Sequence, residues 1–460
     1  EFYDNTEIVF EINDGFKIGE TISPGDTKEI YITFKYKDTS AVPENTTLKS
    51  YLNFKMTEPN RMVAGNSGGS TSNYLTSSVP KEKIESIKFE QGKEPEYSDK
   101  IIERFDASEK QNGGIIGYYT DEDNNGLYEL TFVSQEVIFA NRNALYFFSS
   151  LINLSNINFS NFSTLGIWNM SNMFSNCSKI TEIDASKFKT SNVTNMSYMF
   201  AKCNALTELN ISDFDTKQVT NISSMFRECY NLKSIDVSKL DISNVISMDY
   251  SFYYCSNLTE LDVSNFNTSK VTNLFGTFQG CSKLINLDVS RWNTSKVTNM
   301  GNMFCECNAL NELDVSKFDT ANVTNFGGMF YRCNNFKKID VSNFNTNNAV
   351  TMGAMFYECY EITELNLSSF NTSNVTDMTV MFFWNKKLKT IYVSEYNEDK
   401  GWTTSKVNSS GRMFLGCSNL IGGNGTTYNN NYADATYARI DTEEEPGYFA
   451  NIKDKPIEEQ

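Results

Sequence analysis

Two spacings of apolar residues alternate along most of the chain. Leu209 and Ile211 are spaced by two, as in a short strand with one buried face. In the stretch that follows, Val219, Ile222 and Phe226 occur at intervals of three or four, which favours a short helix or helical turn with one buried stripe. Each unit is therefore predicted to be a strand, a turn and a short helical return.

This unit recurs with a period of 26 residues, and the aligned copies share the phrase LxxLDVSxFxTSxVTNMxxMFxxCxx. A fixed period of this length is the signature of a solenoid of stacked repeats. Ser264, Ser290, Ser316 and Ser342 follow the strand at one fixed place, where we expect the hydroxyl to hydrogen-bond the backbone of the turn. The period is marked by cysteines at positions 177, 203, 229, 255, 281, 307, 333 and 359 and by phenylalanines at positions 174, 200, 226, 252, 278, 304, 330, 356 and 382.

One copy of the unit is too small to fold alone. It contributes about seven or eight buried apolar side chains at roughly 2 kcal/mol each, whereas ordering the backbone costs roughly 1 to 2 kcal/mol per residue. Stacking buries both faces of every copy and pairs the strands into a parallel sheet with a spacing of about 4.8 Å. The repeats are therefore expected to form one continuous stack.

The chain divides into five predicted segments. Residues 1–58 alternate apolar and polar positions, for example in Ile30 to Tyr36, and predict a small β-sandwich-like domain that three or four strands leave incomplete. Residues 59–82 have the Gly- and Ser-rich composition of a flexible linker. An open end of a stack needs a polar cover, so residues 83–150 are assigned to an N-terminal cap. Residues 151–421 are assigned to the repeats, and residues 422–460 are the last segment.

Whole phrases of the repeat resemble a known group. The segment VTNMSYMF, residues 193–200, recurs in near-identical form, and the repeats resemble the 26-residue VTNMxxMFxxCxxL variant found in bacterial surface proteins with BspA-like leucine-rich repeats. The segments GGNGTTY and PGYF near the C-terminus are similar to the closing cap of that family, which implies that residues 422–460 are a C-terminal cap and tail. The resemblance implies an α/β repeat fold, a leucine-rich-repeat solenoid with parallel strands and short helical returns, in an extracellular protein associated with the cell surface or cell wall.

Composition narrows the classes of function. The chain contains no histidine, which removes the commonest general base and metal ligand, so we expect a binding protein that is not an enzyme and carries no cofactor or metal. The formal net charge is -17, which argues against nucleic acid and anionic lipid as partners. We find no apolar run long enough to span a bilayer.

The cysteine row has three interpretations. Each copy directs its thiol the same way, which favours buried free thiols that fill space and meet turn backbone, and Asn385 takes the same place in one copy. Disulfides and a metal site are the alternatives, although CxxC ligand clusters are absent from the sequence. Cys305 lies outside the row, and we expect it to be the most exposed thiol.

Two surfaces are candidates for binding. Residues that flank the central aliphatic of each strand point away from the core and are mostly acidic, which predicts either a face for a basic partner or divalent cations or a solvated face that prevents aggregation. This acidic face comprises Glu182, Asp184, Glu208, Asp236, Glu260, Asp262, Asp288, Glu312, Asp314, Asp340 and Glu364.

The second surface follows the repeat phenylalanine. Aromatic residues in this position predict either an exposed contact strip, since Tyr and Trp supply much of the energy of interfaces, or packing between neighbouring turns. The members of this aromatic flank are Tyr253, Tyr331, Tyr357, Phe383 and Trp384.

The sequence thus predicts a surface protein that mediates adhesion by binding a protein or glycan on another cell or matrix. The alternative is a structural subunit of a surface fibre, in which the incomplete N-terminal β-domain takes a strand from another copy.

Overall fold

The computed structural model describes residues 8–13, 31–36, 59–63, 79–96, 98–397 and 400–456. The chain forms two units, Glu1–Glu58 and Pro59–Gln460. In the first unit, β1 (Ile8–Asn13) and β2 (Tyr31–Tyr36) pair antiparallel, with Ile8 opposite Tyr36. The remaining strands predicted for residues 1–58 lie outside the described residues.

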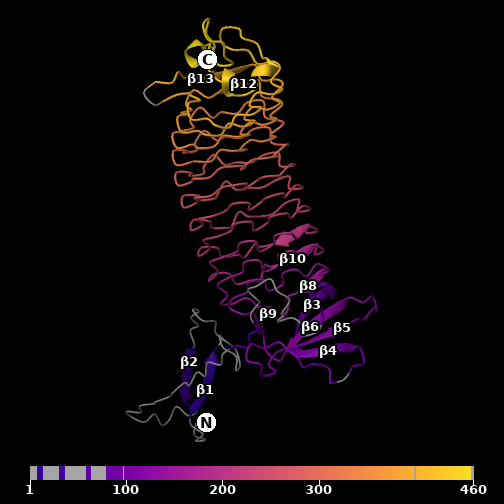
Figure 1. Cartoon of the computed structure of the whole chain (residues 1–460). Helices are drawn as coiled ribbons and strands as arrows, with labels where there is room; N and C mark the ends of the chain where they lie inside the picture. The colour runs from indigo at the N-terminus through magenta and orange to yellow at the C-terminus, as the bar shows by residue number, and fades with distance from the viewer. Residues whose placement is uncertain are drawn as a thin grey trace. The chain divides into compact units, whose positions relative to one another are not determined.

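The second unit is built from coils that stack on one another with the period of the sequence repeat (Figure 1). A row of parallel bridges joins each coil to the next at one fixed position of the repeat. This row shows that neighbouring copies lie in register rather than in separate globules. The bridged positions are Asn143, Asn169, Asn195, Asn221, Ser247, Asn273, Asn299, Asn325, Thr351, Asp377 and Ser409.

The core is a set of parallel rows that run along the stack. From Phe174 to Phe414, consecutive phenylalanine rings lie 5.3 to 6.0 Å apart between centroids and stack face to face. Each of these rings is at most 1% exposed. Because every ring contacts the coil above and the coil below, its burial stabilises two interfaces at once.

The returns of the coils are not helical, so the predicted helical half of the repeat is wrong. Met173 N donates to Met170 O at 3.2 Å, whereas the next amide, Phe174 N, donates to Met199 O in the neighbouring coil at 2.8 Å. Two residues per return, such as Asn172 and Asn176, have a positive φ of 57° and 66°, which an α-helix excludes. A succession of turns also places every third or fourth residue on one side, and for this reason its apolar spacing resembles that of a helix.

Strands form at the two ends of the repeat region only. β10 (Glu182–Asp184) pairs parallel with β11 (Glu208–Asn210), and β12 (Glu364–Asn366) pairs parallel with β13 (Thr390–Val393). Between residues 211 and 363 the corresponding segments do not form strands. In these copies the backbone bonds between coils lie mainly in the returns, so the predicted continuous sheet is also wrong, and the chain is a repeat protein with small parallel sheets.

A five-stranded sheet closes the N-terminal end of the stack. Its order is β4 (Ile101–Asp106), β5 (Ile116–Thr120), β6 (Tyr128–Ser134), β3 (Ile84–Gln91) and β8 (Asn156–Asn158). β3 pairs parallel with both β6 and β8. β8 lies one repeat period before β10, so the cap joins the stack by pairing with the strand of the first coil. The 3-10 helix η1 (Lys81–Lys83) precedes β3, and β7 (Ile138–Phe139) pairs parallel with β9 (Phe162–Ser163).

Part of the predicted linker belongs to this cap. Met62 is fully buried, and its amide donates to Phe139 O at 2.8 Å. Arg61 and Met62 form bridges with Phe139 and Ser108. Residues 60–63 are therefore packed against the cap, because Met62 supplies an apolar side chain to its core. Residues 64–78 lie outside the described residues.

The C-terminal cap combines short strands and 3-10 helices with the buried residue Asp441. β14 (Ala450–Asn451) pairs parallel with β13, and three 3-10 helices surround it, η2 (Asn430–Tyr432), η3 (Ala435–Tyr437) and η4 (Ile452–Asp454). Phe449 is fully buried against Phe414. No helix in the part of the chain that the structure describes could span a membrane.

Candidate functional site

All residues of the predicted acidic face are exposed, but its aspartates have a structural role. Asp262 Oδ1 accepts hydrogen bonds from the amide of Ser264 at 3.0 Å and from its hydroxyl at 2.6 Å. The same pair of bonds holds Asp288 to Ser290. The serine hydroxyl therefore donates to the carboxylate and not, as predicted, to the turn backbone, because the aspartate two residues earlier is the nearer and stronger acceptor.

These bonds lower the pKa of each aspartate of the face. The hydroxyl of the following serine is the largest cause of the lowered pKa, and its amide is the second. Among the described residues, no three carboxylate or thiol groups are placed to hold a metal ion. The aspartates thus fix the turn that follows each of them, and the whole face stays exposed to solvent.

The aromatic flank is a row of stacked rings at the surface. Tyr331 stacks on Tyr357 with centroids 4.4 Å apart, and Tyr357 stacks on Phe383 at 4.7 Å. Trp384 continues the row at 6.0 Å from Phe383 and is 39% exposed. The rings pack against one another and still present part of their surface to solvent. Both alternatives from the sequence, packing between neighbouring turns and an exposed strip, therefore apply.

The structure does not bring Tyr253 into this row. Gln279 and Cys305 occupy the two intervening coils, and Tyr253 instead packs against Tyr250 at 5.1 Å and Tyr254 at 4.6 Å. Two aromatic clusters result, and they are separated by coils that carry smaller side chains.

A polar groove lies between these clusters. It has a volume of about 430 Å³, and sequence reasoning missed it because only the register of adjacent coils brings its residues together. The signal is the position directly after the flank, where Tyr254, Gly280, Glu306, Arg332 and Glu358 follow one another at the repeat period. The groove residues are Tyr254, Ser256, Gly280, Ser282, Glu306, Asn308, Arg332, Asn334, Glu358 and Tyr360.

One charged network crosses the groove. Arg332 Nε donates to Glu358 Oε2 at 2.8 Å, and its Nη1 donates to Glu306 Oε1 at 3.4 Å. The hydroxyl of Tyr254 donates to the other oxygen of Glu306 at 2.6 Å. The guanidinium of Arg332 also lies 5.2 Å from the ring centroid of Tyr331, so cation–π attraction joins this network to the aromatic flank.

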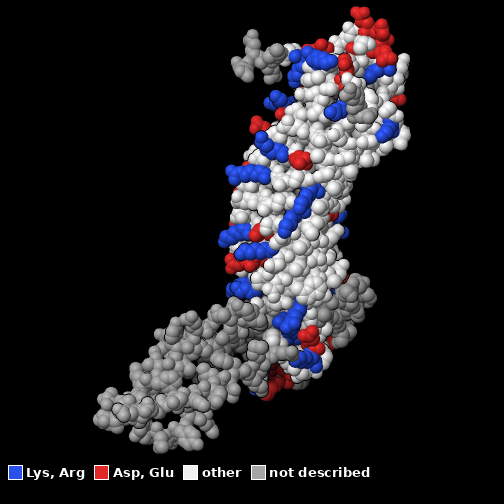
Figure 2. All heavy atoms as spheres, turned by 90° about the vertical axis from the view of Figure 1, so that its left-hand side faces the viewer, with Lys and Arg blue, Asp and Glu red and all other residues white. Residues whose placement is uncertain are grey.

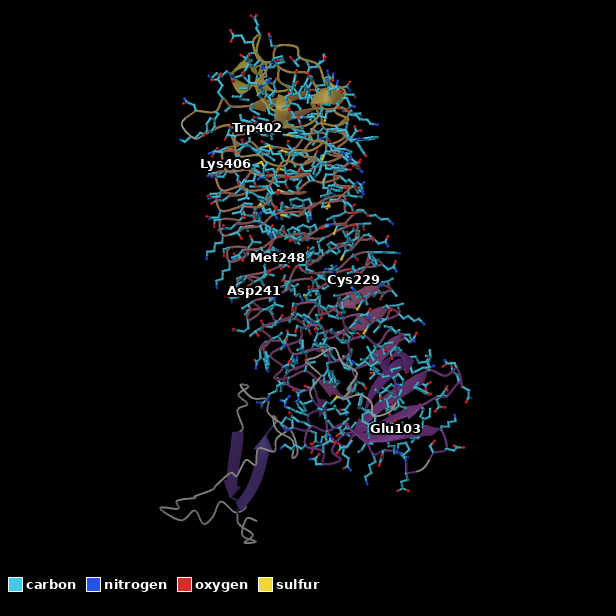
Figure 3. The ribbon with its side chains drawn as sticks, viewed as in Figure 1. Glu103, Cys229, Asp241, Met248, Trp402 and Lys406 are labelled. Carbon is cyan, nitrogen blue, oxygen red and sulfur yellow. The ribbon has the colours of Figure 1, made fainter. Side chains whose placement is uncertain are left out.

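The cysteines are free and buried, as the sequence favoured. Cys229 and Met248, labelled in Figure 3, are both fully buried, and Cys229 Sγ donates to Phe200 O at 3.1 Å. Asn385 donates to Phe356 O at 2.7 Å in the same way, which shows why an amide can replace the thiol. Burial raises the pKa of Cys229 to about 12, so this thiol stays protonated.

Cys305 is the most exposed of the ten thiols, as expected, but it is still buried. It is only 4% exposed, and burial raises the pKa of its thiol to about 12. Its short side chain lies in the row of the aromatic flank, between coils that carry the larger Gln279 and Tyr331. A longer side chain at this position of the repeat would reach the surface, whereas the cysteine side chain does not.

Another face of the stack carries few acidic side chains. Figure 2 shows it as a broad uncharged surface with Lys and Arg side chains at intervals. Lys406, at the left edge in Figure 3, donates to Asn374 Oδ1 at 2.8 Å. The negative charge of the chain is therefore unevenly distributed over the stack.

Comparison with known families agrees with the repeat. The profile of the family described as "Mycoplasma protein of unknown function, DUF285" matches residues 142–261, 247–364 and 337–439. The chain belongs to this family. The three overlapping matches follow the stacked coils and make the DUF285 region a tandem repeat. No curated protein and no solved structure matches the chain.

Proposed function

We propose that the chain is a non-catalytic, extracellular protein of the bacterial cell surface that mediates adhesion through a leucine-rich-repeat solenoid of the BspA-like type. Its partner is a protein or glycan on another cell or on the surrounding matrix. The repeat phrase and its period support the family assignment, and the stacked coils provide the long surface that such binding requires.

The exposed aromatic flank is the observation that carries this proposal. Stacked rings held by neighbouring coils lose little conformational freedom on binding, and Tyr and Trp are the residues most often found at the centres of interfaces. Trp384 is 39% exposed at one end of the row, and Lys386 Nζ lies 4.4 Å from its ring centroid. The flank therefore offers apolar area and a fixed positive charge side by side.

An attachment assay with the full chain tests the proposal. Beads coated with the protein are applied to cultured epithelial cells and to immobilised matrix proteins, with the Trp384→Ala and Tyr357→Ala variants in parallel. We expect attachment by the original chain and about a tenfold or greater loss in each variant, because truncation of a central interface aromatic commonly costs ~2 kcal/mol.

Lys387→Ala is the control, since Lys387 pairs with Glu361 of the neighbouring coil at 2.7 Å and neither residue belongs to the aromatic flank. It should attach as the original chain does. No attachment to any surface, or attachment that the aromatic variants leave unchanged, would contradict the proposal.

A fibre subunit is the second candidate. Among the described residues of the first unit, β1 and β2 form a two-stranded sheet. An isolated pair of strands is marginally stable in water, so a strand from another copy would stabilise it. Light scattering of the purified chain separates the two functions, because a fibre subunit gives filaments whose mass grows with concentration and an adhesin gives monomers.

A further inference from the structure

The groove between the two aromatic clusters owes its shape to Gly280. This residue has a φ of +76°, and a Cβ placed on it would lie 2.7 Å from the ring of Tyr254. The missing side chain lets the Tyr254 ring lie over the next coil, so that its hydroxyl reaches Glu306 two coils away. The ring of Tyr254 thus crosses one coil, and five consecutive coils line the groove.

The charged residues of the groove, one arginine and two glutamates, are paired with one another and sum to a formal charge of -1. Arg332 is held by two carboxylates, one on each neighbouring coil, at 2.8 and 3.4 Å. The side chains of Glu306 and Glu358 are 23% and 13% exposed. A strongly charged ligand would have to compete with this network, whereas a ligand with both hydrogen-bond donors and acceptors can add to it.

The remaining lining completes a pattern suited to hydroxyl groups. Ser256, Ser282 and Asn308 add hydroxyl and amide groups, and Tyr254 and Tyr360 add aromatic rings. Rings beside fixed polar groups can pack against the apolar C–H faces of a sugar while the polar groups bind its hydroxyls. The volume of about 430 Å³ lies within the range of ~300–1,000 Å³ typical of small-ligand sites.

We propose that this groove, centred on Arg332 and bounded by Tyr254 and Tyr360, is a binding site for a neutral oligosaccharide. The proposal deepens the proposed adhesive function, on which it rests, by naming the class of ligand and the coils that bind it. Arg332 and the two glutamates contact the hydroxyls, and the tyrosines contact the sugar faces.

The test is a printed array of neutral and sialic-acid-terminated oligosaccharides probed with the full chain, followed by calorimetric titration of the neutral oligosaccharide that is best retained. We expect retention of neutral structures in preference to sialylated ones. Arg332→Ala should lower the affinity at least about tenfold, because hydrogen bonds to a charged group are lost. Tyr254→Phe, which keeps the ring and removes only the hydroxyl, should lower it severalfold.

Lys387→Ala again serves as the control, because it removes an ion pair between coils outside the groove and should leave the affinity unchanged. Circular dichroism melts of each variant verify folding. An array that retains no neutral oligosaccharide, unchanged affinity in both groove variants, or retention of basic peptides in place of sugars would each overturn the proposal.

The two proposals fail separately. Attachment of the coated beads to cells that is unaffected by Arg332→Ala and Tyr254→Phe would leave the adhesive function standing and overturn the groove. Oligosaccharide binding that depends on Arg332, without attachment to any cell or matrix surface, would support the groove and contradict the adhesive function.

Discussion

Two adjacent phenylalanines test which face of the coil is internal. Phe382 is fully buried and stacks between Phe356 and Phe414 at 5.9 and 5.4 Å. Phe383, the next residue, is half-buried in the aromatic flank, 4.7 Å from the ring centroid of Tyr357. Both residues are phenylalanines on the same coil, so a comparison of their alanine variants isolates the effect of position.

Phe382→Ala should lower the free energy of unfolding by about 3 to 5 kcal/mol, the usual cost of deleting a fully buried phenyl ring. The cost falls at the upper end because the ring bridges two interfaces and the stacked neighbours cannot close the cavity. Phe383→Ala should cost about 1 kcal/mol, since part of its surface already contacts water.

Urea unfolding of the full chain, followed by tryptophan fluorescence, measures both changes. Trp292 and Trp402 are buried at 2% and 6% exposure and report on the middle and the C-terminal end of the stack. Equal losses in the two variants, or a loss below about 1 kcal/mol for Phe382→Ala, would refute the assignment of the internal row.

Two further predictions concern the thiols and the C-terminal cap. None of the ten cysteines should react with a thiol reagent at pH 8 in the folded protein, and all should react in urea. Each is buried, and burial raises the pKa of Cys305 and Cys417 to about 12. Rapid labelling of the folded chain would contradict this prediction. Burial acts to raise the pKa of Asp441, but hydrogen bonds from Thr426, Gly447 and Asn424 outweigh it and leave this pKa below its ordinary value. The stability that Asp441 contributes is therefore present above its unfolded pKa of about 3.9 and is lost as the pH falls through the folded pKa. The difference in unfolding free energy between the original chain and Asp441→Asn, measured by urea unfolding from pH 6 to pH 2, should therefore shrink as the pH falls. A difference that stays constant over this range would contradict the role of the carboxylate.

Much of the fold was accessible from the sequence because the repeat is regular. The fixed spacing of phenylalanine and cysteine correctly placed both rows inside the stack. Val219, Ile222 and Phe226 were also placed correctly as buried, but the local structure inferred from their spacing was wrong. Apolar periodicity reports which side of the chain faces inward, and it does not report whether an amide bonds within its own coil or to the next one.

The site was less accessible for a related reason. The groove is formed by residues of consecutive coils that lie side by side, and a single repeat contains only two of them. In the sequence, Gly280 is one of several residue types found at a turn position of the repeat. In the structure, its lack of a side chain lets Tyr254 reach Glu306. Likewise, the sequence leaves the aspartate of the LDVS phrase as either a binding group or part of a solvated face, and it does not reveal that the serine two residues later donates two hydrogen bonds to it.

Cysteine pairs introduced on the exposed threonine row test the register of the stack most directly. Thr324 N donates to Thr298 O at 2.9 Å, so these residues lie on neighbouring coils, where parallel backbones are about 4.8 Å apart and within disulfide range. We expect the Thr298→Cys, Thr324→Cys double variant to form an intramolecular disulfide under mild oxidation, detected by peptide mapping. Thr298→Cys paired with Asn311→Cys, half a period away, should not form one. Failure of the first pair to link, or equal linking of the second, would contradict the stacking of the coils.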